Sequence, residues 1–352
     1  MKILDQTPLN PDQPKCIGTG LVALDVIIST ITNTNSQFLA GGSCGNVLTI
    51  LSYLGWLSYP IARLSNNVAT ELLIEDFNNW DVKQDFLQVE SSGSTPVIIH
   101  RILKDRRGNP KHRFEFRNPE DGKYLPSYKP CLAKSVPSII ETSPRPNVFY
   151  LDRISRGSIE LAKQYKSLGA VVFFEPTNMK DLKGFDECVK VADIVKFSHD
   201  RISNYDDQYP KSEAGIEIQT IGEKGLKYRR HGQQNWIHVE GYQIENTIDS
   251  AGAGDWCSAA FIYSLFPKHN SVKSINEEDV ISALKFGQAF SALNCMFEGA
   301  RGLMYQFKRN ELLEYIEPIM SQRGNFIDHP NMRAEQRHVD IERKISSLFK
   351  AV

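Results

Sequence analysis

The stretch IDSAGAGDWCSAAF (residues 248–261) places small residues between two aspartates, directly before an apolar segment. Gly252 and Gly254 allow backbone conformations that are closed to other residues, so consecutive N–H groups, including that of Ala253, can face one anion. The apolar segment predicts a helix whose N-terminus adds partial positive charge at the same point. The stretch therefore predicts an anion hole beside Asp255. This carboxylate would either accept a proton from a bound hydroxyl group or simply cap the helix.

A second glycine turn, LAGGSCGNVL (residues 39–48), precedes an apolar helical pattern that ends at Gly55. Gly41 and Gly42 permit a close approach of the backbone to a ligand, and Asn46 falls in the first turns of the helix. We interpret this turn as a site for the hydroxyl groups of a polyol.

A third glycine turn, QTIGEKGLKY (residues 219–228), follows a predicted strand. Thr220, Gly222 and Gly225 suit a backbone that wraps around phosphate groups, with Lys224 as a charge partner. A plain β-hairpin explains the same pattern, so this turn alone does not establish a nucleotide site.

From residue 147 onward, strand and helix patterns alternate. Strands are predicted near 147–152, 170–176 and 192–198, with helices near 158–169 and 181–190. Such alternation indicates a mostly parallel sheet covered by helices on both faces, in the α/β class. Arg153 follows the first of these strands at its carboxyl end, the edge where open α/β sheets bind ligands. It would contact substrate or form a surface ion pair.

Residues 94–117 differ from this pattern, because two β-rich arms flank a turn built on glycine, asparagine and proline. We expect a hairpin that projects from the main body. An isolated hairpin is marginally stable in water, so one face should be covered. Val97, Ile99 and Phe114 are the apolar candidates for a lid-to-lid homodimer, unless the hairpin folds down on its own domain. Its basic residues would recognise a phosphorylated substrate or form a solvated tip.

Charge and composition exclude several classes of function. The 41 lysines and arginines nearly balance the 42 aspartates and glutamates, so a nucleic-acid or acidic-membrane partner has no electrostatic basis. The six cysteines lack CxxC spacing, and no apolar stretch has the length of a membrane span, which favours a reduced, cytoplasmic setting. No GxGxxG follows the first strand, which argues against a dinucleotide-dependent oxidoreductase.

Taken together, the three glycine turns resemble the signatures of the pfkB family of carbohydrate kinases. GGSCGN (41–46), TIGEKG (220–225) and DSAGAGD (249–255) carry the resemblance, and the last is the most specific. Asp25, the 94–117 hairpin and FEGARG (297–302) also fall where that family has them. The similarity covers roughly residues 15–318.

The resemblance implies a ribokinase-like three-layer α/β fold with a mostly parallel central sheet and a small β-rich lid. It implies a kinase domain over residues 1–320, with a lid formed mainly by about 94–117, and a helical extension over 321–352. The implied reaction transfers the γ-phosphoryl group of ATP to a primary hydroxyl of a sugar or sugar-like molecule. The implied cofactors are ATP and Mg²⁺, with room for a monovalent cation.

The resemblance also assigns residues. Asp255 becomes the general base, and the backbone of 252–255 becomes the anion hole. The hydroxyl groups of the acceptor would be held by Asp25, Gly41, Gly42, Asn46 and Arg153. The nucleotide would be approached by Thr220, Gly222, Lys224, Gly225 and Asn294. The roles of Asp25 and Asn294 depend entirely on the resemblance.

One element departs from the family. Many members carry an Asn-x-x-Glu element that arranges the metal, whereas VKFSHDRI has Ser198 and Arg201 at those positions. Glu175 and Asp200 are the carboxylates that remain for this task, so the metal ligands stay unknown. The departure keeps a second hypothesis open, in which the chain retains the fold as a catalytically weak or inactive binding or regulatory protein.

Overall fold

A nine-stranded sheet forms the centre of the molecule in the computed structural model, which describes residues 13–29, 36–104, 110–244, 247–266, 268–321 and 344–352. Its strand order is β13-β12-β11-β10-β9-β8-β1-β4-β5. Neighbouring strands pair parallel from β5 to β11 in this order. The β11–β12 and β12–β13 pairings are antiparallel. The strands are β1 (Lys15–Thr19), β4 (Leu57–Leu64), β5 (Leu87–Val89), β8 (Val148–Leu151), β9 (Val171–Phe174), β10 (Ile194–Ser198), β11 (Ile216–Thr220), β12 (Leu226–Arg230) and β13 (Ile237–Val239).

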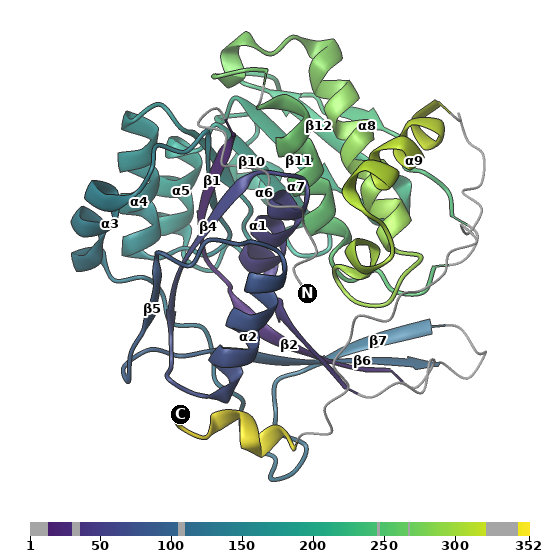
Figure 1. Ribbon diagram of the computed structural model, residues 1–352. Coiled ribbons are helices and arrows are strands. Elements are labelled where there is room, and N and C mark those ends of the chain that lie inside the picture. The colour runs from purple at the N-terminus through teal and green to yellow at the C-terminus, as the bar shows by residue number, and fades with distance from the viewer. Residues whose placement is uncertain (1–12, 30–35, 105–109, 245–246, 267, 322–343) are drawn as a thin grey trace.

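Helices cover both faces of this sheet (Figure 1). One apolar core joins one face to α1 (Ser43–Tyr53), α2 (Val68–Asn79), α7 (Ala253–Leu265), α8 (Glu277–Asn294) and α9 (Arg309–Ser321). A second core joins the other face to α3 (Val136–Thr142), α4 (Arg156–Ser167) and α5 (Leu182–Val191), with the short α6 (Tyr205–Gln208) beside it. Strands β8 and β9 are buried at every position, as parallel strands between two helical layers must be. The predicted three-layer α/β architecture is confirmed.

A smaller four-stranded sheet, in the order β3-β2-β6-β7, lies beside the central one. Its strands are β2 (Ala23–Ser29), β3 (Gln37–Gly41), β6 (Val97–Lys104) and β7 (Pro110–Glu115). Strands β6 and β7 pair antiparallel, as the sequence pattern predicted, but they make up only half of the sheet. We call this four-stranded sheet the lid sheet. The hairpin tip, residues 105–109, lies outside the described residues.

The pairing register gives the lid sheet two different faces. Asp25 pairs with Ile98, and His100 pairs with Phe114, so these side chains share one face. Val97 and Ile99 point to the other face and are 1% and 0% exposed, because they pack into the core that contains α2. The prediction that these two residues form a lid-to-lid contact is therefore wrong: the chain's own domain covers them.

The remaining helical predictions can be compared with the structure directly. Helices α7 and α8 lie where apolar segments were expected, and α1 ends just before Gly55, whose φ is 95°. In the predicted C-terminal helical extension, residues 322–343 lie outside the described part. A short 3-10 turn (Ile345–Phe349) buries Ile345 and Leu348 against the main core. None of the helices described is both long and apolar enough to cross a bilayer.

Candidate active site

Polar residues gather where the parallel strands end. Asp152 follows β8, Glu175 follows β9, and Ser198 and Thr220 are the last residues of β10 and β11. Carboxyl ends of parallel strands lie at the same edge of a sheet, so these four positions share that edge. The N-terminus of α7 meets this edge, because Lys196 of β10 contacts the carbonyl oxygen of Gly254.

The turn before α7 has the geometry of an anion hole. Gly252 has a φ of 73°, and a Cβ atom there would lie 2.1 Å from the carbonyl oxygen of Ala300, so only glycine fits. The first α-helical hydrogen bond runs from the N–H of Trp256 to the carbonyl oxygen of Gly252. The N–H groups of Gly254 and Asp255 precede that bond and have no acceptor four residues back in the helix. They are therefore available to a negatively charged group.

Asp255 lies in the first turn of α7 and is half-buried. Its Oδ2 accepts a 2.8 Å hydrogen bond from Nδ2 of Asn46, which α1 presents from across the site. The pKa of Asp255 is raised to about 7, chiefly by burial and also by the neighbouring Glu175 carboxylate, against the lowering effects of Asn46, Lys196 and Arg201. A carboxylate with a pKa near neutrality can accept and release a proton under physiological conditions.

Asp25 is a second half-buried carboxyl group, on the lid sheet. Burial raises its pKa to about 7, although Arg301 and the N–H of Gly42 both favour its charged form. Gly41 packs so closely that a Cβ atom there would lie 2.0 Å from Oδ2 of Asp25. Asp25 Oδ1 and Asn46 Oδ1 are both buried and accept no hydrogen bond within the described part of the chain. Two oxygen acceptors are therefore available to donors such as ligand hydroxyl groups.

A network of buried charges that the sequence did not reveal lies next to Asp25. Arg301 is 1% exposed; its Nη2 donates to Oδ2 of Asp76 at 2.6 Å and also to the carbonyl oxygen of Ala40. Tyr305 donates to the other oxygen of Asp76 at 3.2 Å. The network links α2, the lid sheet and the FEGARG turn, so it fixes the position of Asp25 relative to the anion hole.

Arg153 does form an ion pair, but with a buried residue. Its Nη1 donates at 2.8 Å to Oδ2 of Asp152, which is 1% exposed, while the N–H of Leu21 donates to Oδ1. A Cβ atom at Gly20 would lie 1.5 Å from Asp152 Oδ1. Arg153 therefore lies at the carboxyl edge, as predicted, and whether it contacts substrate stays a prediction.

The predicted nucleotide turn is a 3-10 turn (Gly222–Lys224) after β11. Gly222 and Gly225 have φ values of 64° and 96°, as the sequence pattern suggested. The carbonyl oxygen of Lys224 pairs with Nε2 of His238, and the Lys224 side chain is exposed. The exposed Gly222 and Lys224 lie between the half-buried Thr220 and the buried Gly225, and together they form one turn at the carboxyl edge.

Asn294 lies deeper than a nucleotide contact requires. It is fully buried, its Nδ2 donates to the carbonyl oxygen of Ala251 at 3.1 Å, and its Oδ1 accepts from the N–H of Leu303 at 3.3 Å. The amide thus joins the anion-hole turn to the turn that follows FEGARG. Its predicted contact with the nucleotide stays a prediction, whereas its structural contacts are clear.

Glu175 and Lys196 form a buried ion pair beneath α7. Lys196 Nζ lies 2.5 Å from Oε1 of Glu175, and the two side chains are 2% and 14% exposed. The other oxygen of Glu175 accepts hydrogen bonds from Tyr150 and Ser258. Both oxygens are thus engaged, which leaves Glu175 poorly suited as a metal ligand. The described residues contain no cluster of three His, Cys, Asp or Glu side chains that could hold a metal ion.

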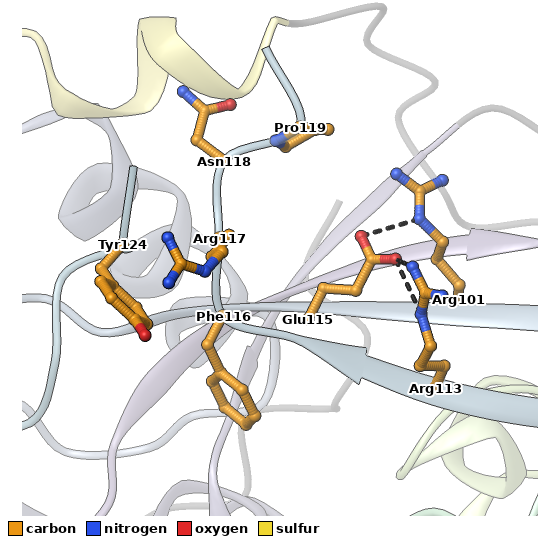
Figure 2. A pocket seen from close by; sticks show the side chains of 8 residues that line it. All are labelled: Arg101, Arg113, Glu115, Phe116, Arg117, Asn118, Pro119 and Tyr124. Carbon is orange, nitrogen blue, oxygen red and sulfur yellow. Dashed lines mark hydrogen bonds and ion pairs between the residues drawn. The ribbon is translucent and has the colours of Figure 1, made fainter. Parts of the chain in front are cut away.

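The lid sheet carries an open groove of about 630 Å³. Figure 2 shows Glu115 between Arg101 and Arg113, whose Nε atoms donate to it at 2.9 and 3.0 Å. Arg117 stacks 3.8 Å above the ring of Tyr124. Arg101 and Arg113 point to the face opposite Asp25, by the alternation of the strands. These arginines therefore lie on the face of the lid sheet that Asp25 does not share.

Known proteins share this fold. A curated relative from Pyrococcus horikoshii is 23% identical over 296 residues, which span 79% of this chain and 86% of the relative. Its solved structure, described as an uncharacterized sugar kinase, superposes with a TM-score of 0.63 at 21% identity over 87% of this chain and 100% of the other. No protein-family model matches the sequence.

Two further solved structures define the fold. A nucleoside kinase from Methanocaldococcus jannaschii, described as a member of the ribokinase family, gives a TM-score of 0.61 at 16% identity over 87% of this chain and 99% of that one. A fructokinase from Xylella fastidiosa with bound ATP gives a TM-score of 0.65 at 16% identity over 86% and 98%. The chain has the ribokinase-like fold. The resemblance that the glycine turns indicated is thereby confirmed.

Within the ribokinase-like fold, the sequence located the anion-hole turn and the Gly41-Gly42 turn but missed the buried charges behind them. Lys196 gave one usable signal, since a lysine inside the apolar strand pattern ADIVKFS is costly to bury without a partner. Arg301 and Asp76 gave none, because they are 225 residues apart in the sequence.

Proposed function

We propose that this protein transfers the γ-phosphoryl group of ATP to a primary hydroxyl group of a sugar or sugar-like molecule. The observation that carries the proposal is the half-buried Asp255 carboxyl group, which has a raised pKa, lies beside the anion-hole turn and is held by Asn46 at 2.8 Å. The similarity to sugar and nucleoside kinases, one of them with bound ATP, supports the same reaction class.

In the proposed reaction, Asp255 accepts the proton of the acceptor hydroxyl. The hydroxyl oxygen forms a bond to the γ-phosphorus, the bond from that phosphorus to the bridging oxygen breaks, and ADP leaves with the bond's electron pair. The available N–H groups at the predicted anion hole, those of Gly254 and Asp255, face the negative charge on the migrating group. Because these groups belong to the start of α7, they need no rearrangement during the reaction.

The acceptor is held from the lid side. Asp25 Oδ1 and Asn46 Oδ1 accept hydrogen bonds from hydroxyl groups next to the reacting one, since both oxygens are otherwise unused. Arg301 and Asp76 keep Asp25 in position. Leaving a buried acceptor unpaired costs about 1–3 kcal/mol, so an analogue that lacks one of these hydroxyls should be discriminated against strongly.

ATP would lie along the turn that contains Thr220, Gly222, Lys224 and Gly225. Mg²⁺ would bind as a complex with ATP, because it is held mainly by phosphate oxygens and water, with few protein carboxylates. When bound, it offsets phosphate charge. The protein's own positive charges near Asp255 come from Arg201 and Lys196. A monovalent cation remains a prediction from the family resemblance.

A catalytically weak or inactive binding protein is the alternative, favoured by Ser198 and Arg201 in place of the metal-arranging pair. The intact contact between Asp255 and Asn46 favours catalysis, because a protein that only binds has no need of a raised-pKa carboxyl group beside an anion hole.

An acceptor screen tests the proposal. ADP release would be measured with ribose, fructose, 2-keto-3-deoxygluconate, nucleosides and phosphosugars, and the phosphorylated product would be identified by mass spectrometry. We expect one class of hydroxyl acceptor to give turnover that Asp255→Asn lacks. ATP binding without turnover on any acceptor would favour the binding-protein alternative instead.

A further inference from the structure

Two charged side chains from neighbouring strands meet under the first turn of α7. Lys196 faces α7 from the middle of β10, and Glu175 follows the end of β9. Lys196 Nζ donates to the carbonyl oxygen of Gly254 at 3.0 Å. A Cβ atom at Gly254 would lie 3.7 Å from that nitrogen and 3.8 Å from Oε1 of Glu175. The residue before Asp255 therefore rests directly on the ion pair.

Every polar atom of this pair is engaged with elements that build the site. Tyr150 of β8 donates to Oε2 of Glu175 at 3.0 Å, and Ser258 of α7 donates to the same oxygen. Ser258 also contacts the carbonyl oxygen of Gly254 at 3.1 Å. Three strands of the central sheet are thus tied to one helical turn through two buried charges. Such a fixed arrangement is what a positioned general base requires.

We propose that the Glu175–Lys196 ion pair is the positioning unit of Asp255: it holds the first turn of α7 against β8, β9 and β10 and balances the charge beside the base. This inference rests on the proposed function for its catalytic meaning. The pair touches neither the proposed acceptor oxygens nor the nucleotide turn, so it acts through Asp255 and the Gly254 carbonyl.

The electrostatic side of the proposal has a definite sign. Glu175 raises the pKa of Asp255, whereas Lys196 lowers it, so the intact pair has opposing effects. Burial alone would lower the pKa of Lys196, but the Glu175 carboxylate together with Cys257 and Asp255 outweighs this effect, so the pKa is raised and the ammonium stays charged. The other titratable groups that face Asp255 are Arg201, which follows β10, Cys44 on α1 and Tyr150 on β8.

The test measures the ionisation of Asp255 directly, by ¹³C NMR titration of the aspartate carboxyl groups. The Asp255 resonance is the one absent from the Asp255→Asn protein. In Glu175→Gln, the repelling charge is gone while Lys196 remains, so the Asp255 midpoint should fall by about one pH unit or more. In the double variant Glu175→Gln, Lys196→Met, both charges are gone and most of that decrease should be recovered.

A matched control comes from another buried ion pair. Arg229 on β12 has its Nε 2.8 Å from Oε2 of Glu217 on β11, and these side chains are 1% and 0% exposed. Glu217→Gln breaks a buried pair of the same kind without removing a charge beside Asp255, so the Asp255 midpoint should not move. Should Glu175→Gln not fold, Lys196→Met supplies the opposite change, and the midpoint should rise.

The pH dependence of kcat/KM, measured with an acceptor that the enzyme phosphorylates, gives a second readout. In Glu175→Gln, the acidic limb of the kcat/KM profile should move to lower pH together with the NMR midpoint. A purely structural role would lower kcat/KM at every pH and leave the limb in place. An unchanged Asp255 midpoint in Glu175→Gln, or an equal shift in Glu217→Gln, would overturn the inference. The NMR titration needs no substrate, so it stands even if no acceptor is phosphorylated.

Discussion

Replacing Asp255 by asparagine should stabilise the protein at alkaline pH, and the size of the effect follows from the site. The pKa of this carboxyl group is raised from its ordinary value of 3.8 to about 7, chiefly by burial. A difference of about three in pKa corresponds to about 4 kcal/mol of free energy. Because Asp255 is half-buried, solvent screening reduces the effect, so this value is its upper limit.

The sign follows from which state holds the proton. Between about pH 4 and pH 7, folded Asp255 keeps a proton that the unfolded chain has lost, so the free energy of unfolding falls as the pH rises through that window. Asparagine carries no charge and can still pair with Asn46. The variant should therefore match the wild type near pH 4 and exceed it by up to about 4 kcal/mol near pH 8.

Urea denaturation from pH 4 to pH 8 would measure this difference. Asp207→Asn, an exposed residue at the start of α6, serves as the matched control and should show no such trend. A stability difference between Asp255→Asn and wild type that is the same at all pH values would refute the argument from burial.

Three further predictions concern the metal element, the lid sheet and the anion-hole turn. At saturating ATP, the activity of the wild type should still rise at free Mg²⁺ above the ATP concentration. The double variant Ser198→Asn, Arg201→Glu should bind Mg²⁺ more tightly and reach full activity at lower free Mg²⁺. Identical titration curves would show that these residues lie away from the metal. The homodimer through the lid remains a prediction, now limited to Phe114, whose side chain is 44% exposed; Phe114→Ser should then shift light scattering toward the monomer, and a strictly monomeric wild type would count against the dimer. Gly252→Ala should lower the free energy of unfolding by about 2 kcal/mol or more, because it adds a clash to an unfavourable φ. Gly169→Ala, with a φ of 92° and open space around it, should cost only about 1 kcal/mol by the same denaturation assay, and equal losses in the two variants would argue against the close contact at the anion hole.

The layers of the fold could be predicted because each depends on a local pattern. The apolar runs VFYL and VVFF are buried on both sides, and the helix between them shows its periodicity and a capping box at Ser155 and Ser158. The lid-to-lid contact predicted for Val97 and Ile99 was wrong for a physical reason. Val97 and Ile99 bury against their own domain, and no local pattern distinguishes that partner from a second copy of the chain.

The parts of the candidate site that depend on backbone conformation could be predicted from the sequence. Gly252 and Gly42 have φ values of 73° and 76°, conformations for which glycine is the natural residue, so the sequence marks them. The charges that position Asp25 and Asp255 were not predictable in the same way. The Glu175–Lys196 and Arg301–Asp76 pairs join residues far apart in the chain, and only the fold brings them together.

The most direct test of the central claim compares turnover and nucleotide affinity in wild type and Asp255→Asn, once an acceptor is known. Because Asp255 acts on the acceptor proton while backbone N–H groups hold the phosphates, we expect kcat to fall by about 10²–10⁴. The Kd for ATP, measured by calorimetry, should stay within a few-fold of the wild-type value. A variant that keeps more than half of its turnover would contradict the assignment of Asp255 as the base.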